Sequence, residues 1–409
     1  MAWSEEMSMP VSESGGAQLR GTNQSGMRIY NEKLILTLLR RFGAMPKSEL
    51  TRMTGLSAQT VSVIMRGLEN DGLVLRGEPV RGRIGQPSTP MALDPDGVFS
   101  IGMKIGRRSA ALVLMDFTGA IRMQERVHYR YPLPGRMMEF LREGLEKARG
   151  QLDDVQWGRV AGIGIAAPFE LWNWPEQLGA PAAEMEAWRD FSFGEEIARF
   201  TRLPVFVEND ASCACGAENV FGLGREYSDF AYFFVGSFIG GGVVLNGAIF
   251  TGRTGNAGAF GTLPIRHHDR KGDQLIDSAS IFVLETRLKE AGIDPSPLWL
   301  DPDGWDRFEP HLSDWIEMTG ESLAIAAVSV CSVIDFEAVL VDGGFPAAVG
   351  ERIVAAARRS LDTVDWQGIE KPNIQRAEVG ANARVLGAAS LPLFARYLLS
   401  HAINRKEAA

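Results

Sequence analysis

The sequence is poor in cysteine and histidine and contains no long apolar segment. Its 409 residues include three cysteines and five histidines, too few cysteines for a disulfide framework and suited to a reducing cytosol. No run approaches the roughly 18 uninterrupted apolar residues of a transmembrane helix. Residues 1–26 lack the basic start and apolar centre of a secretory signal. We therefore expect a cytoplasmic protein with a disordered tail over residues 1–26.

Two of the cysteines, Cys213 and Cys215, lie two positions apart in a run of small residues. Residues at this spacing point in different directions on a helix. The pair therefore favours small buried side chains over one half of a metal site.

The length and the distribution of charge both indicate more than one domain. With 45% hydrophobic and 23% charged residues, the chain is typical of a globular protein of two or three domains. The net charge is −9, yet residues 28–93 contain ten Lys or Arg and five Asp or Glu, which leaves −14 for the remainder. A basic segment on an acidic body is one pattern that nucleic-acid binding produces, although alone it does not establish that function.

Three short helices are predicted within the basic segment. Apolar residues over 29–42 form one helical stripe, which Gly43 ends. A second helix, roughly 46–53, begins at Pro46, where a missing N–H is tolerated. Ser57 is expected to cap a third helix, with an inner face of Val61, Ile64, Met65 and Leu68.

The outer face of this third helix is polar and suits contact with base edges and phosphates. The candidate DNA-binding residues on this face are Gln59, Thr60, Ser62 and Arg66, and Lys47 of the second helix and the capping Ser57 are further candidates. A solvated amphipathic helix in any three-helix bundle explains this segment equally well.

The residues that follow favour DNA binding. Residues 73–75 and 91–93 are predicted strands on either side of a glycine-rich loop that carries Arg81, Arg83 and Gln86. Such a flexible basic tip can reach a phosphate or the minor groove. Three helices followed by a basic-tipped hairpin predict a winged helix-turn-helix DNA-binding domain over residues 27–95.

Beyond residue 98 the pattern changes to alternating strands and helices. Three strands are predicted within 98–127, helices at 137–152 and 191–201, and strands at 160–166, 204–207, 230–235 and 338–341. Asn209 and Asp210 follow the 204–207 strand and open a helix, a location that ligand sites favour in α/β sheets. Glycine clusters at 240–242 and 343–344 suit either an anion near the backbone or close packing of the chain.

With these residues placed, the chain resembles the regulator branch of the ROK family (repressors, open reading frames and kinases). The segments that carry the resemblance are GRIGQPSTPMALDPDG, Asn209-Asp210, GSFIGGGVVLNG, TGRTGNAGAFG, VLVDGG and GANARVLGAA. Together they are specific, whereas no single segment is, and they cover about residues 28–400.

The resemblance implies an α/β fold, in which an N-terminal winged helix-turn-helix is followed by a two-lobed actin-like (ribonuclease H-like) ATPase or sugar-kinase fold. The small lobe is expected over 96–208 together with a C-terminal helix at 392–409. The large lobe, with ligand-site and oligomerisation surfaces, is expected over 209–391.

Departures from the kinase pattern argue against catalysis. The resemblance implies an aspartate that helps to hold Mg²⁺ at the end of the first strand, but Lys104 stands there, and an ammonium cannot ligate Mg²⁺. Phe238 replaces a glycine of the phosphate loop. Asp210 aligns with the general base that takes a proton from the sugar. Without a nucleotide site we expect Asp210 to be vestigial, so we predict no catalytic residue and no cofactor.

The sugar side also departs from the pattern. Ala259 and Thr262 replace a Glu and a His, Ile276 replaces another Glu, and Phe169 follows Pro168 in place of glycine. A hydroxyl-rich ligand needs convergent charged acceptors, so glucose-like binding is in doubt. A smaller or different pocket is expected, with the ligand-binding residues Asn209, Asp210, Asn256, Gly258 and Thr262.

The structural zinc site of the family requires one histidine and three cysteines. No cysteine lies between Thr262 and Ser280, and the adjacent His267 and His268 point apart on most backbones. A polar surface loop therefore explains this segment better than a metal site, and no metal is expected.

The resulting hypothesis is a cytoplasmic transcription regulator, a repressor of carbohydrate-related genes. Its expected partners are operator DNA and a sugar or sugar-derived effector; it forms a homodimer or homotetramer and contacts no membrane. One alternative is a ROK-type sugar kinase that phosphorylates a hexose with ATP and carries a DNA-binding head, which Asp210 supports but Lys104 and Phe238 oppose. Another is an interaction module whose winged head binds protein.

Overall fold

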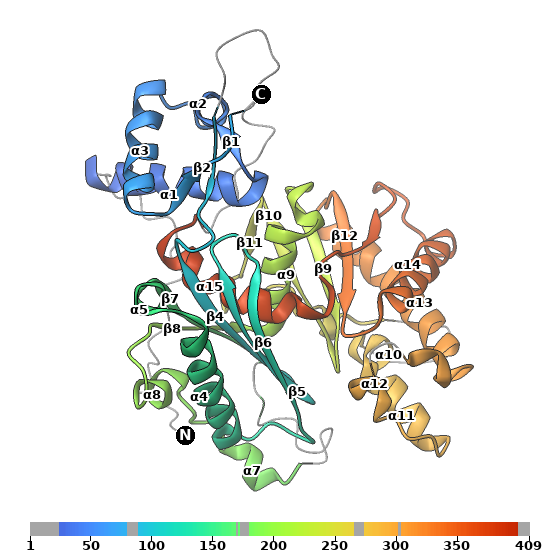
Figure 1. Ribbon diagram of the computed structural model, residues 1–409. Helices are drawn as coiled ribbons and strands as arrows, with labels where there is room; N and C mark the ends of the chain where they lie inside the picture. The colour runs from blue at the N-terminus through green and yellow to red at the C-terminus, as the bar shows by residue number, and fades with distance from the viewer. Residues whose placement is uncertain are drawn as a thin grey trace, which may run out of the picture.

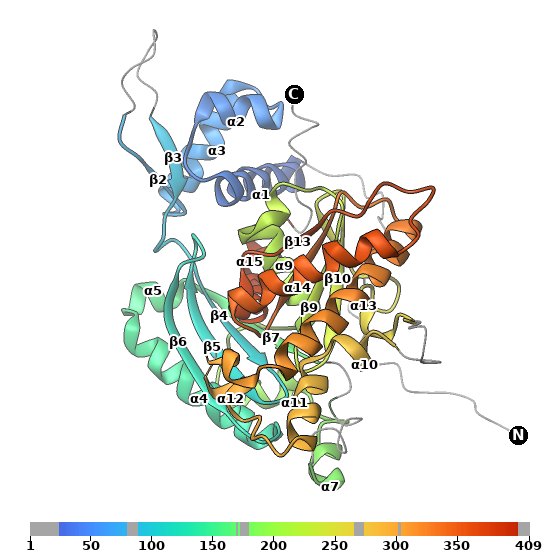
Figure 2. The same cartoon turned by 90° about the vertical axis from the view of Figure 1, so that its right-hand side faces the viewer.

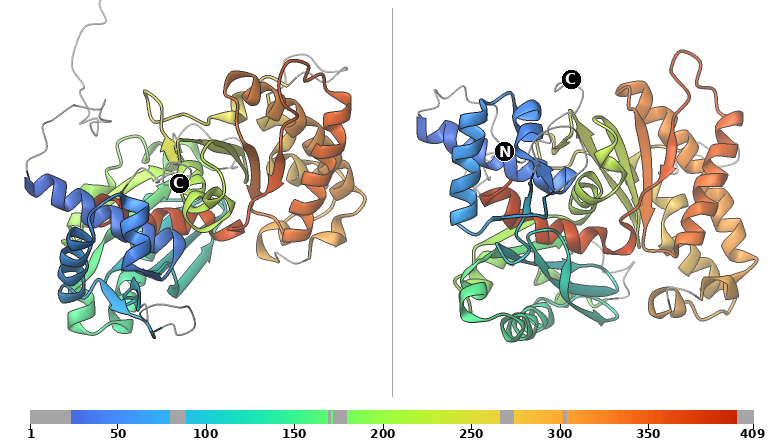
Figure 3. Two further views of the ribbon diagram at one scale, coloured as in Figure 1. Left: turned by 90° about the horizontal axis from the view of Figure 1, so that it is seen from above. Right: turned by 45° about the horizontal axis from the view of Figure 1, so that its top comes forward.

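The computed structural model describes residues 24–79, 89–168, 171, 180–265, 274–301 and 304–399. It consists of a small N-terminal head on a body of two α/β lobes (Figure 1). Seen from above, the head lies over the first lobe while the second lobe extends to one side (Figure 3). The predicted fold class, a winged helix-turn-helix followed by a two-lobed actin-like fold, is confirmed.

The head contains the three predicted helices, α1 (Gln24–Phe42), α2 (Lys47–Thr54) and α3 (Ala58–Asn70). Strands β2 (Val74–Arg76) and β3 (Pro90–Leu93) form the hairpin, which projects away from the body (Figure 2). A two-residue strand, β1 (Met45–Pro46), pairs with β3. Sequence reasoning missed β1 because two residues carry no periodicity.

The first lobe is built on a five-stranded sheet with the order β6-β5-β4-β7-β8. Its strands are β4 (Phe99–Ile105), β5 (Ser109–Asp116), β6 (Ile121–His128), β7 (Val160–Ala167) and β8 (Val205–Asn209). Helix α4 (Pro134–Gln151) packs on one face, and the short helices α5 (Asp154–Gly158), α7 (Ala182–Glu186) and α8 (Phe193–Ala198) complete the lobe. Helix α8 is shorter than the helix predicted over 191–201.

The second lobe has a sheet with the order β11-β10-β9-β12-β13. Its strands are β9 (Phe230–Val235), β10 (Ile239–Leu245), β11 (Ala248–Phe250), β12 (Ala338–Gly343) and β13 (Ile374–Arg376). The β10–β11 turn uses Asn246 and Gly247 at positive φ, 53° and 69°, as a two-residue hairpin turn requires. Helices α10 (Ile276–Ala279), α11 (Ile281–Glu290), α12 (Pro297–Leu300), α13 (His311–Val333) and α14 (Ala347–Ser360) cover its outer side.

Helix α13 is long and apolar enough to cross a bilayer by length and composition. Its buried side chains, among them Trp315 and Leu323, pack with β9, β12 and α14 in the largest apolar cluster of the second lobe. The helix therefore contributes to the core of this lobe, which accounts for its apolar composition.

Two helices lie back to back between the sheets, α9 (Asp210–Phe221) and α15 (Ala383–Arg396) (Figure 1). Gly102 of β4 and Gly164 of β7 are register partners beneath α15. A Cβ at Gly164 would lie 1.8 Å from the carbonyl oxygen of Ala388. Only glycine permits this approach, so α15 lies directly on the backbone of the first sheet.

The C-terminal helix differs from the prediction of a helix over 392–409. It begins at Ala383 and ends at Arg396, and the described chain ends at residue 399. Pro392, which favours a helix start, lies inside α15 and is buried there. Packing on β4, β7 and α9 outweighs the local preference of proline.

Candidate ligand pocket and DNA-binding surface

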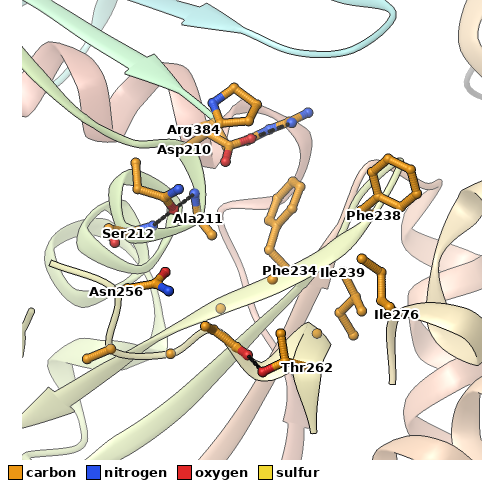
Figure 4. A pocket seen from close by; sticks show the side chains of 18 of the residues that line it. Asp210, Ala211, Ser212, Phe234, Phe238, Ile239, Asn256, Thr262, Ile276 and Arg384 are labelled. Carbon is orange, nitrogen blue, oxygen red and sulfur yellow. Dashed lines mark hydrogen bonds and ion pairs between the residues drawn. The ribbon is translucent and has the colours of Figure 1, made fainter. Parts of the chain in front are cut away.

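A cavity of about 600 Å³ opens between the two lobes. Asn209 and Asp210 line it from the first lobe at the start of α9, while the β9–β10 turn and residues 254–262 line it from the second. Figure 4 shows Asp210 and Arg384 on one side of the cavity, with Asn256 and Thr262 opposite. All five predicted ligand-binding residues line this cavity, so the fold brings them together.

At the start of α9, Asn209 caps the helix and Asp210 forms an ion pair. The Oδ1 atom of Asn209 accepts hydrogen bonds from the N–H groups of Ala211 and Ser212, at 2.9 and 3.3 Å, and so caps the helix. The Oδ2 atom of Asp210 lies 3.2 Å from Nη1 of Arg384, and both side chains are largely buried. Asp210 is therefore held in an ion pair.

The loop opposite is held close to β10. Gly258 has a φ of +85°, and a Cβ there would lie 2.5 Å from the Cα of Gly242. Glycine at this position thus serves close packing rather than contact with a ligand. Thr262 donates its hydroxyl to the carbonyl of Ala259 at 2.9 Å, whereas the side chain of Asn256 is exposed at the cavity.

Lys104, at the position where an Mg²⁺ ligand was expected, is buried on β4. Its Nζ atom donates to the carbonyl oxygen and the Oγ of Ser109, at 2.9 and 2.6 Å. Burial lowers the pKa of Lys104 well below its ordinary value, and the nearby Arg384 and Arg126 lower it further. Nζ of Lys104 is occupied with oxygens of Ser109, and Lys104 itself offers no oxygen ligand for Mg²⁺.

Two contacts join the lobes, and the residues of the first line the cavity. The guanidinium of Arg107 lies over the ring of Phe238, 4.1 Å from its centroid. Beside it, Nη2 of Arg108 lies 3.1 Å from Oε1 of Glu285 in α11. Burial lowers the pKa of Arg107 to about 10, so it remains charged at neutral pH. Phe238, at the phosphate-loop position, is therefore covered by a cation from this chain.

Sequence reasoning missed Arg107 and Arg384 as lining residues. Arg384 stands within the GANARVLGAA segment, but nothing in that segment places it beside Asp210, which lies 174 positions earlier. Arg107 follows Lys104 in the turn after β4, where its side chain could have pointed to solvent. The tertiary structure brings both to the cavity.

The predicted DNA-binding residues occupy the outer side of the head. Gln59 and Arg66 of α3 are exposed, and Lys47, Thr60 and Ser62 are half-buried. The Oγ of Ser57 accepts the N–H of Thr60 at 3.1 Å, which confirms the predicted cap. Arg81, Arg83 and Gln86 lie outside the described residues.

One further residue belongs to this surface. Val63 is 58% exposed and shares a helical stripe with Gln59, Ser62 and Arg66. The expected inner face of α3 is buried, so its outward stripe is polar with one apolar residue. Apolar side chains of this kind can contact the methyl group of thymine in the major groove.

The head and the body share one apolar cluster. Residues of α1, α2 and α3 pack together with β5 and α15. Arg40 of α1 is buried, donates to the carbonyl of Phe117 and lies 5.0 Å from the ring centroid of Phe221, at the end of α9. Three residues beyond the end of α15, the N–H of Leu399 donates to Oγ1 of Thr37 at 2.9 Å.

Within the described ranges, no group of three or more His, Cys, Asp or Glu side chains is placed so that it could hold a metal ion. His267 and His268 fall outside those ranges. Cys213 and Cys215 are buried in α9, and burial raises the pKa of both thiols. They are small core residues, as predicted.

These features define a two-lobed actin-like body with a winged helix-turn-helix head. Residues 100–273 match the ROK family, and the chain carries a ROK family domain. Among curated proteins, it is 25% identical over 243 residues to a xylose repressor of Bacillus spizizenii. That match covers 59% of this chain and 62% of the repressor, so the chain spans less than two thirds of its relative.

Solved structures show the same fold. A ROK family transcriptional regulator, described as a homologue of the Escherichia coli MLC protein, superimposes with a TM-score of 0.64 at 21% identity and covers 90% of this chain and 96% of its own. A ROK family glucokinase from Streptomyces griseus, in complex with glucose and AMPPNP, gives a TM-score of 0.55 at 23% identity, covering 72% of this chain and 98% of its own. The regulator therefore matches a larger part of this chain than the kinase does.

Proposed function

We propose that this protein is a DNA-binding transcription regulator, a repressor of carbohydrate-related genes, whose body binds a small effector without phosphorylating it. The observation that carries the proposal is the winged head, which presents the polar stripe of α3 outward and packs its opposite face into a core shared with the body. A head that served only as a structural cap would have no need of this outward polar stripe.

The proposed DNA contacts come from α3 and the residues around it. Gln59 and Arg66 are exposed on the same stripe of α3, two turns apart, and Lys47 lies at the start of α2. An α-helix fits the major groove of B-DNA, where arginine and glutamine side chains pair with base edges. Arg81, Arg83 and Gln86 remain proposed contacts of the wing to the phosphates or the minor groove.

The packing of α9 and α15 offers a path from the pocket to the head. Both helices begin at the pocket, at Asp210 and near Arg384, and both end against α1. A ligand that shifts either helix would therefore move α1 and change the position of the head. The xylose repressor relative supports an effector of the sugar class by its name.

Oligomerisation and location complete the proposal. We propose a location in the cytoplasm. We also propose a homodimer or homotetramer, because two heads related by a twofold axis would bind a palindromic operator with half-sites about 34 Å apart.

Selection from a random pool of duplexes tests DNA binding whatever the sequence of the operator. Duplexes enriched by the full chain are labelled, and their binding is measured by fluorescence anisotropy at several salt concentrations. Arg66→Ala should weaken binding by about 1–3 kcal/mol and relax the sequence preference, whereas Arg142→Ala, an exposed arginine on α4, should do neither. A pool without enriched sequences, or equal affinity for all duplexes, would contradict sequence-specific binding.

A sugar kinase is the second candidate, because Asp210 lines the pocket and several solved structures of this fold are kinases. The ion pair of Asp210 with Arg384 and the buried ammonium of Lys104 oppose it. A coupled ADP-release assay over common hexoses and amino sugars discriminates between the two. Turnover that Asp210→Asn abolishes would replace the regulator proposal by the enzyme.

A further inference from the structure

A second cavity, of about 230 Å³, lies where the head meets the body. Its walls come from α1 of the head, from α9 and α15, and from the ends of β8 and β11. Among the described lining residues, Ser212 is the only one that also lines the cavity between the lobes. This second space, the head–body cavity, is therefore a separate site whose walls belong to both the head and the body.

The wall of the head–body cavity is largely apolar. Its apolar lining residues include Val220, Ile249, Leu391, Phe394 and Leu398. An engineered apolar cavity of about 150 Å³ stays free of water and binds benzene. The head–body cavity is larger than this, so it has room for a molecule of one ring with a small substituent.

Arg40, which lines this cavity, brings a hydrogen-bond donor to it. Its Nη1 atom donates to the carbonyl oxygen of Phe117, whereas Nε and Nη2 are buried and make no hydrogen bond within the described chain. Nη2 lies beside the turn at Gly119, where a Cβ would be 3.1 Å away, which leaves Nε as the donor for the cavity. A buried donor without a partner costs free energy that a ligand oxygen can recover.

Asn219, also in the lining, brings an acceptor. Its Nδ2 atom donates to the carbonyl oxygen of Gly247 at 3.0 Å, and this bond fixes which way the amide points. Its Oδ1 atom is buried and makes no hydrogen bond within the described chain. Other polar residues of the wall already donate to main-chain carbonyl oxygens, namely Thr37, Arg41 and Ser390. Arg40 and Asn219 are thus the groups that the polar part of a ligand would satisfy.

The ligand needs no charge of its own. Burial lowers the pKa of Arg40 to about 10 and the carboxylate of Asp116 raises it, so Arg40 stays charged at neutral pH with a counter-charge nearby. Glu208 also lines the cavity, and a ligand carboxylate would share the cavity with this acidic side chain. A neutral acceptor therefore suits the wall better than an anion.

We propose that the head–body cavity is a second ligand site, which binds a small neutral molecule with an apolar ring, one acceptor oxygen for Arg40 and one N–H or O–H donor for Asn219. The ring packs against Leu391 and Phe394. Occupancy would hold α1 against α9 and α15, because a ligand there contacts the head and the body together. The site itself is independent of the proposed function, whereas an effect of the ligand on DNA affinity rests on that function.

Ligand-observed NMR titrations of the full chain test the site with four molecules of one ring each. Toluene has neither polar group, acetophenone has the acceptor alone, and benzamide has both the acceptor and the donor. We expect benzamide to bind about tenfold more tightly than toluene, with acetophenone between them, because each recovered hydrogen bond adds affinity. Benzoate has the shape of benzamide but carries a negative charge, and it should bind more weakly than benzamide.

Variants assign the binding to the head–body cavity. Val220→Phe adds a ring to the wall and should abolish benzamide binding, because the new side chain occupies the space of the ligand. Val155→Phe on α5, at a site that is 71% exposed, should not change it. Arg40→Met should bring the affinity for benzamide close to that for toluene and leave toluene unaffected. Circular dichroism shows whether each variant is folded, and Val220→Phe keeps the test decisive if Arg40→Met does not fold.

Three results would overturn the proposed site: no binding of benzamide at millimolar concentration, equal affinity for toluene and benzamide, or unchanged binding of benzamide to Val220→Phe. Tighter binding of benzoate than of benzamide would overturn the choice of a neutral ligand.

DNA binding of the same preparations separates this inference from the proposed function. If the chain binds enriched duplexes but not benzamide, the inference fails and the regulator proposal stands. If benzamide binds but no duplex is enriched, the second site stands and the DNA-binding function fails. When both bind, saturating benzamide should change the affinity for the duplex in the wild type but not in Val220→Phe; an unchanged affinity in the wild type would refute the coupling of the site to the head.

Discussion

Gly387 lies on α15 where this helix meets the backbone of α9. A Cβ at this position would lie 1.9 Å from the carbonyl oxygen of Cys213 and 2.8 Å from its Cα. Both obstacles are backbone atoms of a helix that is itself buried, so no side chain can rotate away. Gly387→Ala therefore requires α15 and α9 to separate.

The magnitude follows from two opposing contributions. An extra carbon in a packed core costs roughly 1–3 kcal/mol, and a contact with backbone belongs at the upper end of that range. Alanine also favours a helix over glycine by about 1 kcal/mol. We expect Gly387→Ala to lower the free energy of unfolding by about 2 kcal/mol, the difference between these two contributions.

Urea unfolding followed by tryptophan fluorescence and circular dichroism measures this loss. Gly150→Ala is the matched control, because Gly150 lies in α4 with nothing within 4 Å of its Cβ position. The control should gain up to about 1 kcal/mol. If Gly387→Ala were as stable as the control, the close packing of α9 against α15 would be refuted, and with it the proposed path from the pocket to the head.

Two further predictions concern charge and capping. Burial lowers the pKa of Lys104 below 10.5, so the unfolded chain binds the Lys104 proton more tightly than the folded chain. The contribution of Lys104 therefore makes the free energy of unfolding rise with pH up to about 10.5. Lys104→Met should therefore be more stable than the wild type at neutral pH, with a gap in urea midpoint that narrows as the pH approaches 10.5; a gap independent of pH would contradict this. Ser57→Ala removes the hydroxyl that accepts the N–H of Thr60 at 3.1 Å and should cost about 1 kcal/mol, measured by thermal unfolding, whereas Ser48→Ala, an exposed serine on α2, should not destabilise the head.

Much of the fold could be predicted because its signals are local. The apolar stripe of α3 and its Ser57 cap lie within a few residues of one another, and an Asn-Gly pair specifies the β10–β11 turn. The strands predicted at 160–166, 230–235 and 338–341 were found for the same reason, since each is a short apolar run. By contrast, β1 and the extent of α15 depend on partners distant in the chain, and local reasoning missed or misplaced them.

The same division holds for the site. The sequence by itself determined that Asn209 and Asp210 end a strand and open a helix, and that a lysine stands at position 104, because residue identity and strand ends are local properties. Only the tertiary structure decided that Arg384 pairs with Asp210, and that Arg107 reaches Phe238 of the other lobe. Contacts between residues far apart in the chain arise from helix and sheet packing, which leaves no pattern in a single sequence. The pairing of charged groups around the pocket is therefore a property of the folded chain.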